Sequence, residues 1–253
     1  MRRSAFRAWI CFGILVVGAS PAWLSAQAPT SPMAMMTDIA VKPSMLGEFR
    51  AAMKAMVELS AKHKAGYGWT AHMTDDHHCL LISPVADYAD AGKMLKEDAS
   101  LSQYGAEFSA RAEKLAATYE SFTSYMVSYK PELSLLPARP RPSNDSVYTI
   151  YDIWYIIPGR EQEFEALARE NAALAKAKGS VDAWICLCGE LGCDQPVYFY
   201  YAVDKGPAEF WDHNAEMWKA LGQEGEVLNG KMIRLLRKRD MLGSWRSRKG
   251  CGR

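Results

Sequence analysis

Apolar and polar positions along the chain follow an order that occurs twice. In the later half, residues 147–157 are rich in β-branched and aromatic side chains, as is typical of a strand, and Pro158-Gly159 ends the run. Residues 161–178 then carry apolar side chains on one helical stripe that stops at Gly179. Next come two strands at 183–188 and 197–203, a helical region at 207–236 and a short strand at 241–245. The pattern predicts the order β-α-β-β-α-β.

The first half predicts the same order with weaker strands. Strands are expected at 34–41, 68–73, 79–85 and 125–129, and helical segments at 46–64 and 88–121. Between the halves, residues 131–146 contain Pro131, Pro137, Pro140 and Pro142, a composition that resists both helix and sheet. We interpret this segment as a linker.

Identical residues support a duplication. A constant offset of 115 positions aligns Pro43 with Pro158, Glu48 with Glu163, Phe49 with Phe164, Ala51 with Ala166 and Trp69 with Trp184. A proline, a phenylalanine and a tryptophan are among the matches, and the order of predicted elements agrees as well. The chain is therefore expected to hold two copies of one α/β unit, at 34–130 and 147–246.

Two strands of the second copy carry large side chains on both faces. Tyr198 to Tyr201 and residues 151–156 place aromatic or apolar groups at successive positions, which point to opposite sides of a strand. A sheet of this kind needs cover on both sides. Helices would cover one face and a second sheet the other.

With these features the sequence resembles the dimeric α/β-barrel superfamily, which includes antibiotic-biosynthesis-type and haem-degrading monooxygenases. The resemblance implies an α+β fold in which two ferredoxin-like βαββαβ units pack sheet to sheet. Relatives do this as homodimers, whereas both units here stand in one chain. We therefore expect an intramolecular α/β barrel, and a monomer with a pseudo-dimeric barrel.

The start of the chain predicts export. Arg2, Arg3 and Arg7 precede an apolar run at 9–17 that is too short to span a bilayer, and small residues follow near Ala26. We interpret residues 1–26 as a signal peptide, with cleavage after Ala28 as the alternative. The mature protein is then periplasmic or secreted, and residues 247–253 form a basic tail.

Charge and motifs exclude several classes of function. Of 30 basic residues the leader removes three, which leaves 27 against 29 acidic residues and a mature charge of about −2. Nothing in this balance attracts nucleic acid or an anionic membrane surface. The chain also has no Gly-rich phosphate loop, no G-x-S-x-G, no H-E-x-x-H and no C-x-x-C-H motif.

Candidate ligand-binding residues gather in the second unit: Trp184, Tyr198, Tyr200, Trp211, His213 and Trp218. In haem-degrading relatives a histidine of the second helix ligates iron, and a tryptophan and an asparagine from the sheet shape the pocket. The resemblance implies that His213 corresponds to that histidine, as a candidate catalytic residue, and Trp184 to that tryptophan. The asparagine has no match, since Asp152 and Trp154 occupy the first strand. The correspondence of His213 implies haem as a candidate cofactor. The alternative is that His213 forms only a local hydrogen bond on the helix.

Histidines and cysteines offer two further candidate sites. His72, His77 and His78 cluster at a hairpin tip of the first unit, where Zn²⁺ or Cu²⁺ binding competes with a plain polar turn. Cys188 and Cys193 flank residues 189–192, a spacing that predicts a disulfide across a hairpin. A thiolate metal site that includes Cys186 is the alternative, and Cys251 is a candidate free thiol.

Two functions remain open from the sequence. The first is an exported small-molecule binding or interaction module, in which the aromatic residues of the second unit are simply core. The alternative is a monooxygenase-like oxidoreductase that acts on an aromatic or haem-like ligand. The sequence favours the first.

Overall fold

The structure is a computed structural model that describes residues 31–63, 68–100, 105–136, 146–180 and 182–247. Within these ranges the chain forms two compact units, Ser31–Tyr125 and Met126–Arg246. The expected signal peptide and the end of the basic tail lie outside the described residues. Among the helices of the described ranges, none combines the length and the apolar character needed to traverse a bilayer.

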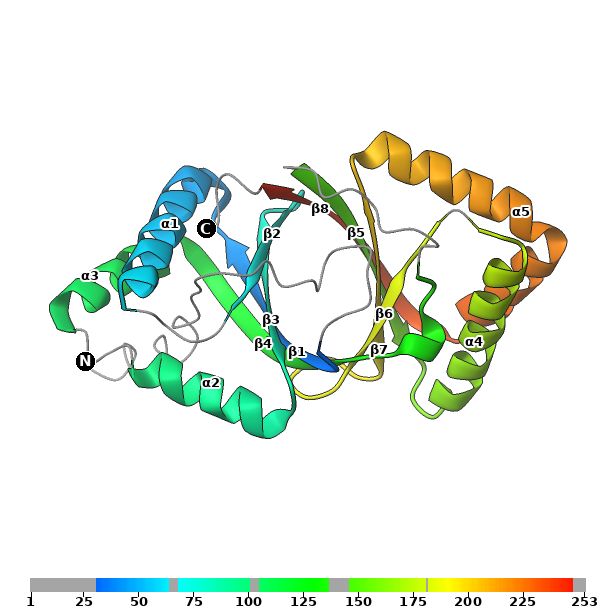
Figure 1. Ribbon diagram of the computed structural model, residues 1–253, viewed down its shortest axis with the longest axis horizontal. Helices are drawn as coiled ribbons and strands as arrows, with labels where there is room; N and C mark the ends of the chain where they lie inside the picture. The colour runs from blue at the N-terminus through cyan, green and yellow to red at the C-terminus, as the bar shows by residue number, and fades with distance from the viewer. Residues whose placement is uncertain (1–30, 64–67, 101–104, 137–145, 181, 248–253) are drawn as a thin grey trace. The chain divides into compact units, whose positions relative to one another are not determined.

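The first unit is a four-stranded sheet with helices on one face (Figure 1). Its elements are β1 (Met33–Val41), α1 (Leu46–His63), β2 (Thr70–Thr74), β3 (His78–Val85), α2 (Tyr88–Ser100), α3 (Gly105–Ala116) and β4 (Tyr119–Tyr129). Strands β1 and β3 pair antiparallel, as do β2 and β3, and β4 lies along the other edge of β1. The resulting order β4-β1-β3-β2 is that of a ferredoxin-like unit.

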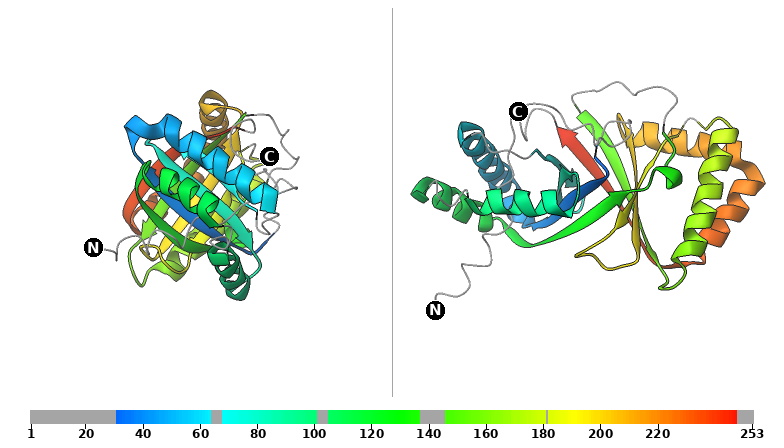
Figure 2. Two further views of the ribbon diagram at one scale, coloured as in Figure 1. Left: turned by 90° about the vertical axis from the view of Figure 1, so that its left-hand side faces the viewer. Right: turned by 60° about the horizontal axis from the view of Figure 1, so that its bottom comes forward.

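The second unit repeats this arrangement. Its elements are η5 (Pro131–Leu133), β5 (Ser146–Ile156), α4 (Glu161–Ala177), β6 (Ile185–Gly189), β7 (Val197–Asp204), α5 (Pro207–Ile233) and β8 (Leu236–Ser247). The strand order is β8-β5-β7-β6, and α4 and α5 lie on one face of the sheet (Figures 1 and 2). The prediction of two βαββαβ units in series is confirmed.

Residues that match between the two copies have matching places in the fold. Phe49 of α1 and Phe164 of α4 are both almost completely buried, each on the first helix of its unit. Trp69 lies just before β2, and Trp184 lies just before β6. In both units, the first helix thus buries its apolar stripe through a phenylalanine at the equivalent position.

The register of β5 on β7 builds the core of the second unit. Trp154 pairs with Tyr198, and their side chains pack together with Phe164 of α4 in one buried cluster. On the opposite face of the same two strands, Tyr151 pairs with Tyr201. The centres of their rings lie 6.0 Å apart, and both residues are almost completely buried. Both faces of these strands are therefore buried, as their two-sided apolar pattern predicts.

The structure differs from the sequence expectation at the last strand of each unit. Strand β4 begins at Tyr119 and β8 at Leu236, several residues before the predicted starts at 125 and 241. Both extensions contain charged residues, such as Glu120 and Lys238, that lower the strand propensity. Pairing within the sheet, rather than local preference, makes these residues extended.

The expected linker also begins as part of the second unit. Leu133 is completely buried among β5, α4 and β7 residues, and Leu135 is 8% exposed. Leu135 forms a backbone bridge with Trp184, with both N–H to O distances at 2.9 Å. Residues 131–136 are thus packed structure, although Pro131 opens the segment.

Candidate functional site

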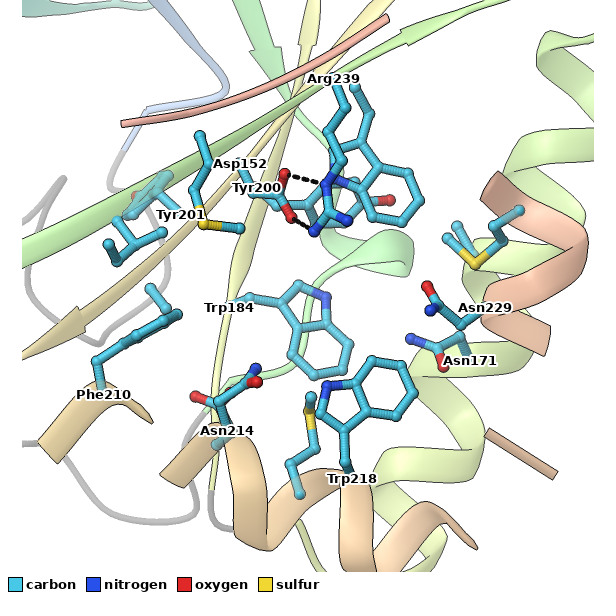
Figure 3. A pocket seen from close by; sticks show the side chains of 18 of the residues that line it. Asp152, Asn171, Trp184, Tyr200, Tyr201, Phe210, Asn214, Trp218, Asn229 and Arg239 are labelled. Carbon is cyan, nitrogen blue, oxygen red and sulfur yellow. Dashed lines mark hydrogen bonds and ion pairs between the residues drawn. The ribbon is translucent and has the colours of Figure 1, made fainter. Parts of the chain in front are cut away.

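A cavity of about 320 Å³ lies in the second unit between its sheet and its two helices. Figure 3 shows the side chains that line it. The sheet and the segment before β6 contribute Asp152, Trp154, Trp184, Tyr200, Tyr201 and Arg239. The helices contribute Asn171, Phe210, Trp211, Asn214, Trp218 and Asn229.

Helix α5 presents its lining residues at helical spacing. Phe210, Asn214, Met217 and Trp218 recur at three- and four-residue steps and so share one face. The helix bends after this face, because Gly222 has a φ of 58° and a ψ of −152° that are not helical. The bend brings Asn229, on the second segment of α5, beside Asn171 of α4 (Figure 3).

Trp184 is held in place from behind. Its indole Nε1 donates a 2.9 Å hydrogen bond to the carbonyl oxygen of Leu133, and its backbone pairs with that of Leu135. The ring is thereby fixed at the centre of the cavity, close to the indole of Trp218 (Figure 3). A wall that is ordered before binding reduces the entropy that a ligand must overcome.

Asp152 and Arg239 form the charged corner of the cavity. Arg239 Nε and Nη2 donate to the two carboxylate oxygens of Asp152 at 2.8 and 2.6 Å, a bidentate pair (Figure 3). The guanidinium also lies 5.0 Å from the centre of the Trp154 ring. The hydrogen bond to Asp152 raises the pKa of Arg239, which keeps the guanidinium protonated.

The tyrosines of β7 differ in their positions. Tyr200 lines the cavity, and burial raises the pKa of its hydroxyl well above the usual value, with a further contribution from the nearby Cys186 thiol. Tyr198 is not among the lining residues. It packs in the core cluster and donates to Glu165 at 2.9 Å, and burial raises its pKa as well.

His213 lies outside the cavity wall. Its Nδ1 is 3.0 Å from Asp204 Oδ1, and its side chain is 28% exposed. Together with Glu209, these two residues are the one group of three metal-ligating side chains found among the described residues. Lys205 Nζ sits 3.1 Å from Glu209, so a cation of the chain itself already occupies this end of the group.

The histidines of the first unit do not assemble into a comparable group. His78 Nδ1 is 2.7 Å from Asp38 on β1, and His77 takes a left-handed backbone conformation with a φ of 70° at the tip of the turn. His72 is completely buried on β2. The hairpin tip thus has the geometry of a tight turn.

The bond predicted between Cys188 and Cys193 is absent from the structure, in which both are free thiols. A side chain on Gly189 would come within 2.6 Å of Cys193 Sγ, so this sulfur lies on the side of β6 to which residue 189 points. Adjacent strand residues point to opposite faces, which places Cys188 on the other side. Burial raises the pKa of Cys188 to about 11 and raises that of Cys193 as well.

Of the predicted ligand-binding residues, the cavity brings together Trp184, Tyr200, Trp211 and Trp218. Sequence reasoning missed Arg239 and the three asparagines as site residues. Arg239 stands in a run of basic residues, which is ordinarily a solvated surface, and asparagine on a helix carries no specific signal. The unusual Asp152 on the first strand was the available hint of a charged partner.

Comparisons with known proteins place the fold. No family model and no curated protein sequence matches the chain. A solved structure of a candidate monooxygenase from Fusobacterium nucleatum aligns with a TM-score of 0.58 at 11% identity, over 87% of this chain and 96% of that one. The structure of an anthrone oxidase-like protein aligns with a TM-score of 0.53 at 16% identity, over 89% of this chain and 96% of that one. The structure of a mutant chlorite dismutase from Candidatus Nitrospira defluvii aligns with a TM-score of 0.55 at 13% identity, over 90% of this chain and 95% of that one.

The chain has the fold of the dimeric α/β-barrel superfamily. These alignments extend over both of its units, and the predicted fold class is confirmed. At 8 to 16% identity the likeness concerns the fold alone. The chemistry of this chain therefore has to be inferred from its own cavity.

A haem iron does not fit the residues of that cavity. Among the described residues, neither a histidine nor a cysteine lines it, and His213 lies outside its wall. Burial raises the pKa of Tyr200 and of Tyr201 well above the usual value, which keeps both phenols protonated and makes them poor iron ligands. The correspondence of His213 to an iron-ligating histidine concerns a place outside this cavity and stays a prediction.

Proposed function

We propose that the second unit binds a small, planar aromatic molecule in its cavity. The observation that carries the proposal is the composition of the wall, where six aromatic side chains of the described residues surround a space of about 320 Å³. They are Trp154, Trp184, Tyr200, Phe210, Trp211 and Trp218. Small-molecule sites are typically apolar clefts of roughly 300–1,000 Å³ with a few placed polar groups, and this one is at the small end of that range.

The indoles of Trp184 and Trp218 favour an aromatic over an aliphatic ligand. They come from opposite walls, one next to β6 and one on α5, and meet near the centre of the cavity (Figure 3). Offset or edge-to-face contacts between aromatic rings are worth roughly 0.5–1.5 kcal/mol beyond the area they bury. A flat ring system gains this energy from both walls.

Equilibrium dialysis with 2-acetylnaphthalene tests the proposal. The wild-type chain is expected to bind one molecule saturably, and Trp218→Ala to weaken binding about tenfold or more, since an aromatic wall is lost. Val227→Ala is the matched control, because Val227 is exposed on the same helix and does not line the cavity. Absence of saturable binding to a panel of two- and three-ring aromatics, or an unaffected Trp218→Ala, would refute the proposal.

A monooxygenase-like reaction on the bound ligand is the second candidate. The cavity is aromatic, and solved structures with this fold include a candidate monooxygenase and an anthrone oxidase-like protein. The reaction would convert a CH₂ group of the ligand and O₂ into a carbonyl group and water, so the ligand itself supplies the two electrons and two hydrogens that reduce the second oxygen atom. Oxygen uptake in the presence of a bound aromatic ketone or phenol, lost in Trp218→Ala, would support it, and unchanged ligand after aerobic incubation would count against it.

We also propose that the protein acts outside the cytoplasm as a monomer. The support is the leader pattern at 1–26 and the presence of both units in one chain. Expression of the full chain in a bacterial host is expected to yield a processed protein that begins at Gln27 or Pro29, in the periplasmic or culture fraction. N-terminal sequencing and multi-angle light scattering check the start and the mass.

A further inference from the structure

The charged side chains of the cavity restrict the chemistry of its ligand more than the aromatic walls do. Among the described residues, three ionisable side chains other than tyrosine line it: Asp152, Asp182 and Arg239. Asp182 is 4% exposed, and one of its oxygens accepts a hydrogen bond from the backbone N–H of Ala183 at 2.8 Å. Two carboxylates and one guanidinium thus line a space that is largely apolar.

The guanidinium is already neutralised by the chain itself. Its Nε and Nη2 donate to Asp152 in a bidentate pair, and its central carbon lies over the ring of Trp154, 5.0 Å from the ring centre. The pair is fixed by both contacts, and Arg239 remains 40% exposed at the side chain. Nη1 takes part in neither bond to Asp152, so its N–H groups remain as donors to a ligand.

We propose that Asp152 acts as a charge filter in this cavity, so that the Asp152–Arg239 pair selects neutral aromatic molecules with an oxygen acceptor and rejects the corresponding carboxylates. The inference rests on the proposed function, since it concerns the ligand of the same cavity. Arg239 Nη1 hydrogen-bonds a neutral carbonyl oxygen. A carboxylate at the same place would meet the Asp152 carboxylate across the guanidinium, where like charges in a partly desolvated space repel strongly. Rejection by an unfavourable charge is a common source of ligand specificity.

Three naphthalenes of nearly equal shape isolate these effects. The probes are 2-acetylnaphthalene, with a neutral acceptor, 2-naphthoate, with a carboxylate, and 2-isopropylnaphthalene, with no acceptor. In equilibrium dialysis at pH 7 and low salt, the wild-type chain is expected to bind the ketone about tenfold more tightly than either of the others. The comparison needs no variant and therefore does not depend on a mutant that folds.

Asp152→Asn is expected to reverse the charge preference. It keeps the shape of the side chain and removes the negative charge, so Arg239 is left to attract an anion. The ratio of naphthoate to ketone affinity should rise by about tenfold or more relative to wild type. Arg239→Gln should remove the preference of the ketone over the isopropyl compound.

Asp194→Asn is the matched control. Asp194 forms the same kind of bidentate pair with Arg237, at 2.9 and 2.8 Å, and neither residue lines the cavity. The affinity ratios of this variant should remain those of wild type. A similar rise in both aspartate variants would show that overall charge, and not the filter, sets the preference.

The two proposals fail in different ways. If the wild-type chain binds all three naphthalenes equally well, or if Asp152→Asn leaves the ratio of naphthoate to ketone unchanged, the charge filter is wrong and aromatic binding stands. If none of the three binds and the larger aromatic panel does not bind either, the proposed function itself is wrong.

Discussion

The indole N–H of Trp184 donates a 2.9 Å hydrogen bond to the carbonyl oxygen of Leu133, fifty-one positions earlier in the chain. This bond ties the central ring of the cavity to a segment whose proline content indicates a linker. Leu133 itself is completely buried in the core of the second unit. The cavity wall and the segment before β5 therefore form one packed structure.

Trp184→Phe is expected to lower the free energy of unfolding by about 1–2 kcal/mol, because the Leu133 carbonyl loses its donor. Trp69→Phe is the matched control at the equivalent position of the first unit. Among the described residues, the indole nitrogen of Trp69 is buried without a hydrogen-bond partner, so this change removes no bond. Urea denaturation measures both variants, and equal destabilisation would contradict the assigned role of the bond.

Leu133→Ala is expected to destabilise the protein by about 2–5 kcal/mol, since it opens a cavity in a closed cluster. Glu132→Ala, at the exposed neighbouring position, should change the free energy of unfolding by less than about 0.5 kcal/mol. The thermal midpoint and urea denaturation test this pair. A small effect of Leu133→Ala would show that residues 131–136 act as a free linker.

His213→Ala should leave the affinity for 2-acetylnaphthalene within about twofold, because the imidazole does not line the cavity. The same change should cost about 1–2 kcal/mol of stability through the loss of the bond to the buried Asp204. Haemin titrated into wild type should give no saturable Soret shift. A saturable shift that disappears in His213→Ala would restore the histidine as an iron ligand.

Cys188 is expected to react slowly with iodoacetamide. Only the thiolate is the nucleophile, and burial raises the pKa of this thiol to about 11. At pH 8 the rate should therefore be roughly 100-fold below that of an ordinary exposed cysteine, and it should keep rising up to about pH 11. Peptide mass spectrometry of alkylated protein follows the site, and a rate that levels off near pH 9 would contradict the buried placement.

The same mass spectrometry tests the predicted disulfide. The structure places Cys188 and Cys193 on opposite sides of β6, so protein isolated from the periplasm should yield both as alkylated thiols after non-reducing digestion. A linked peptide would show instead that the hairpin rearranges on oxidation. A thiol at Cys188 that can be alkylated in Cys193→Ser but not in the wild-type protein would also argue for the linked form.

The sequence by itself determined the order of elements, the duplication and the two-sided burial of the second unit's strands. The duplication depends on identical residues that recur at a constant offset of 115 positions. The order of elements and the two-sided burial depend on local pattern: the apolar positions at residues 151–156, the stripe that includes Phe164, and the breaks at Pro158-Gly159 and Gly179. Neighbouring residues carry this information, because backbone periodicity translates directly into faces. The order of elements was the signal that indicated the fold.

Only the tertiary structure decided which residues form the cavity. Arg239 comes from β8, Asn171 from α4 and Asp152 from β5, and nothing in their local sequence relates them. It also separated Tyr198 and His213 from Trp184, Tyr200, Trp211 and Trp218, although all are equally plausible from composition. The physical reason is that side-chain direction within an element follows from spacing, whereas the partner across the cavity depends on strand order and on the bend of α5 at Gly222.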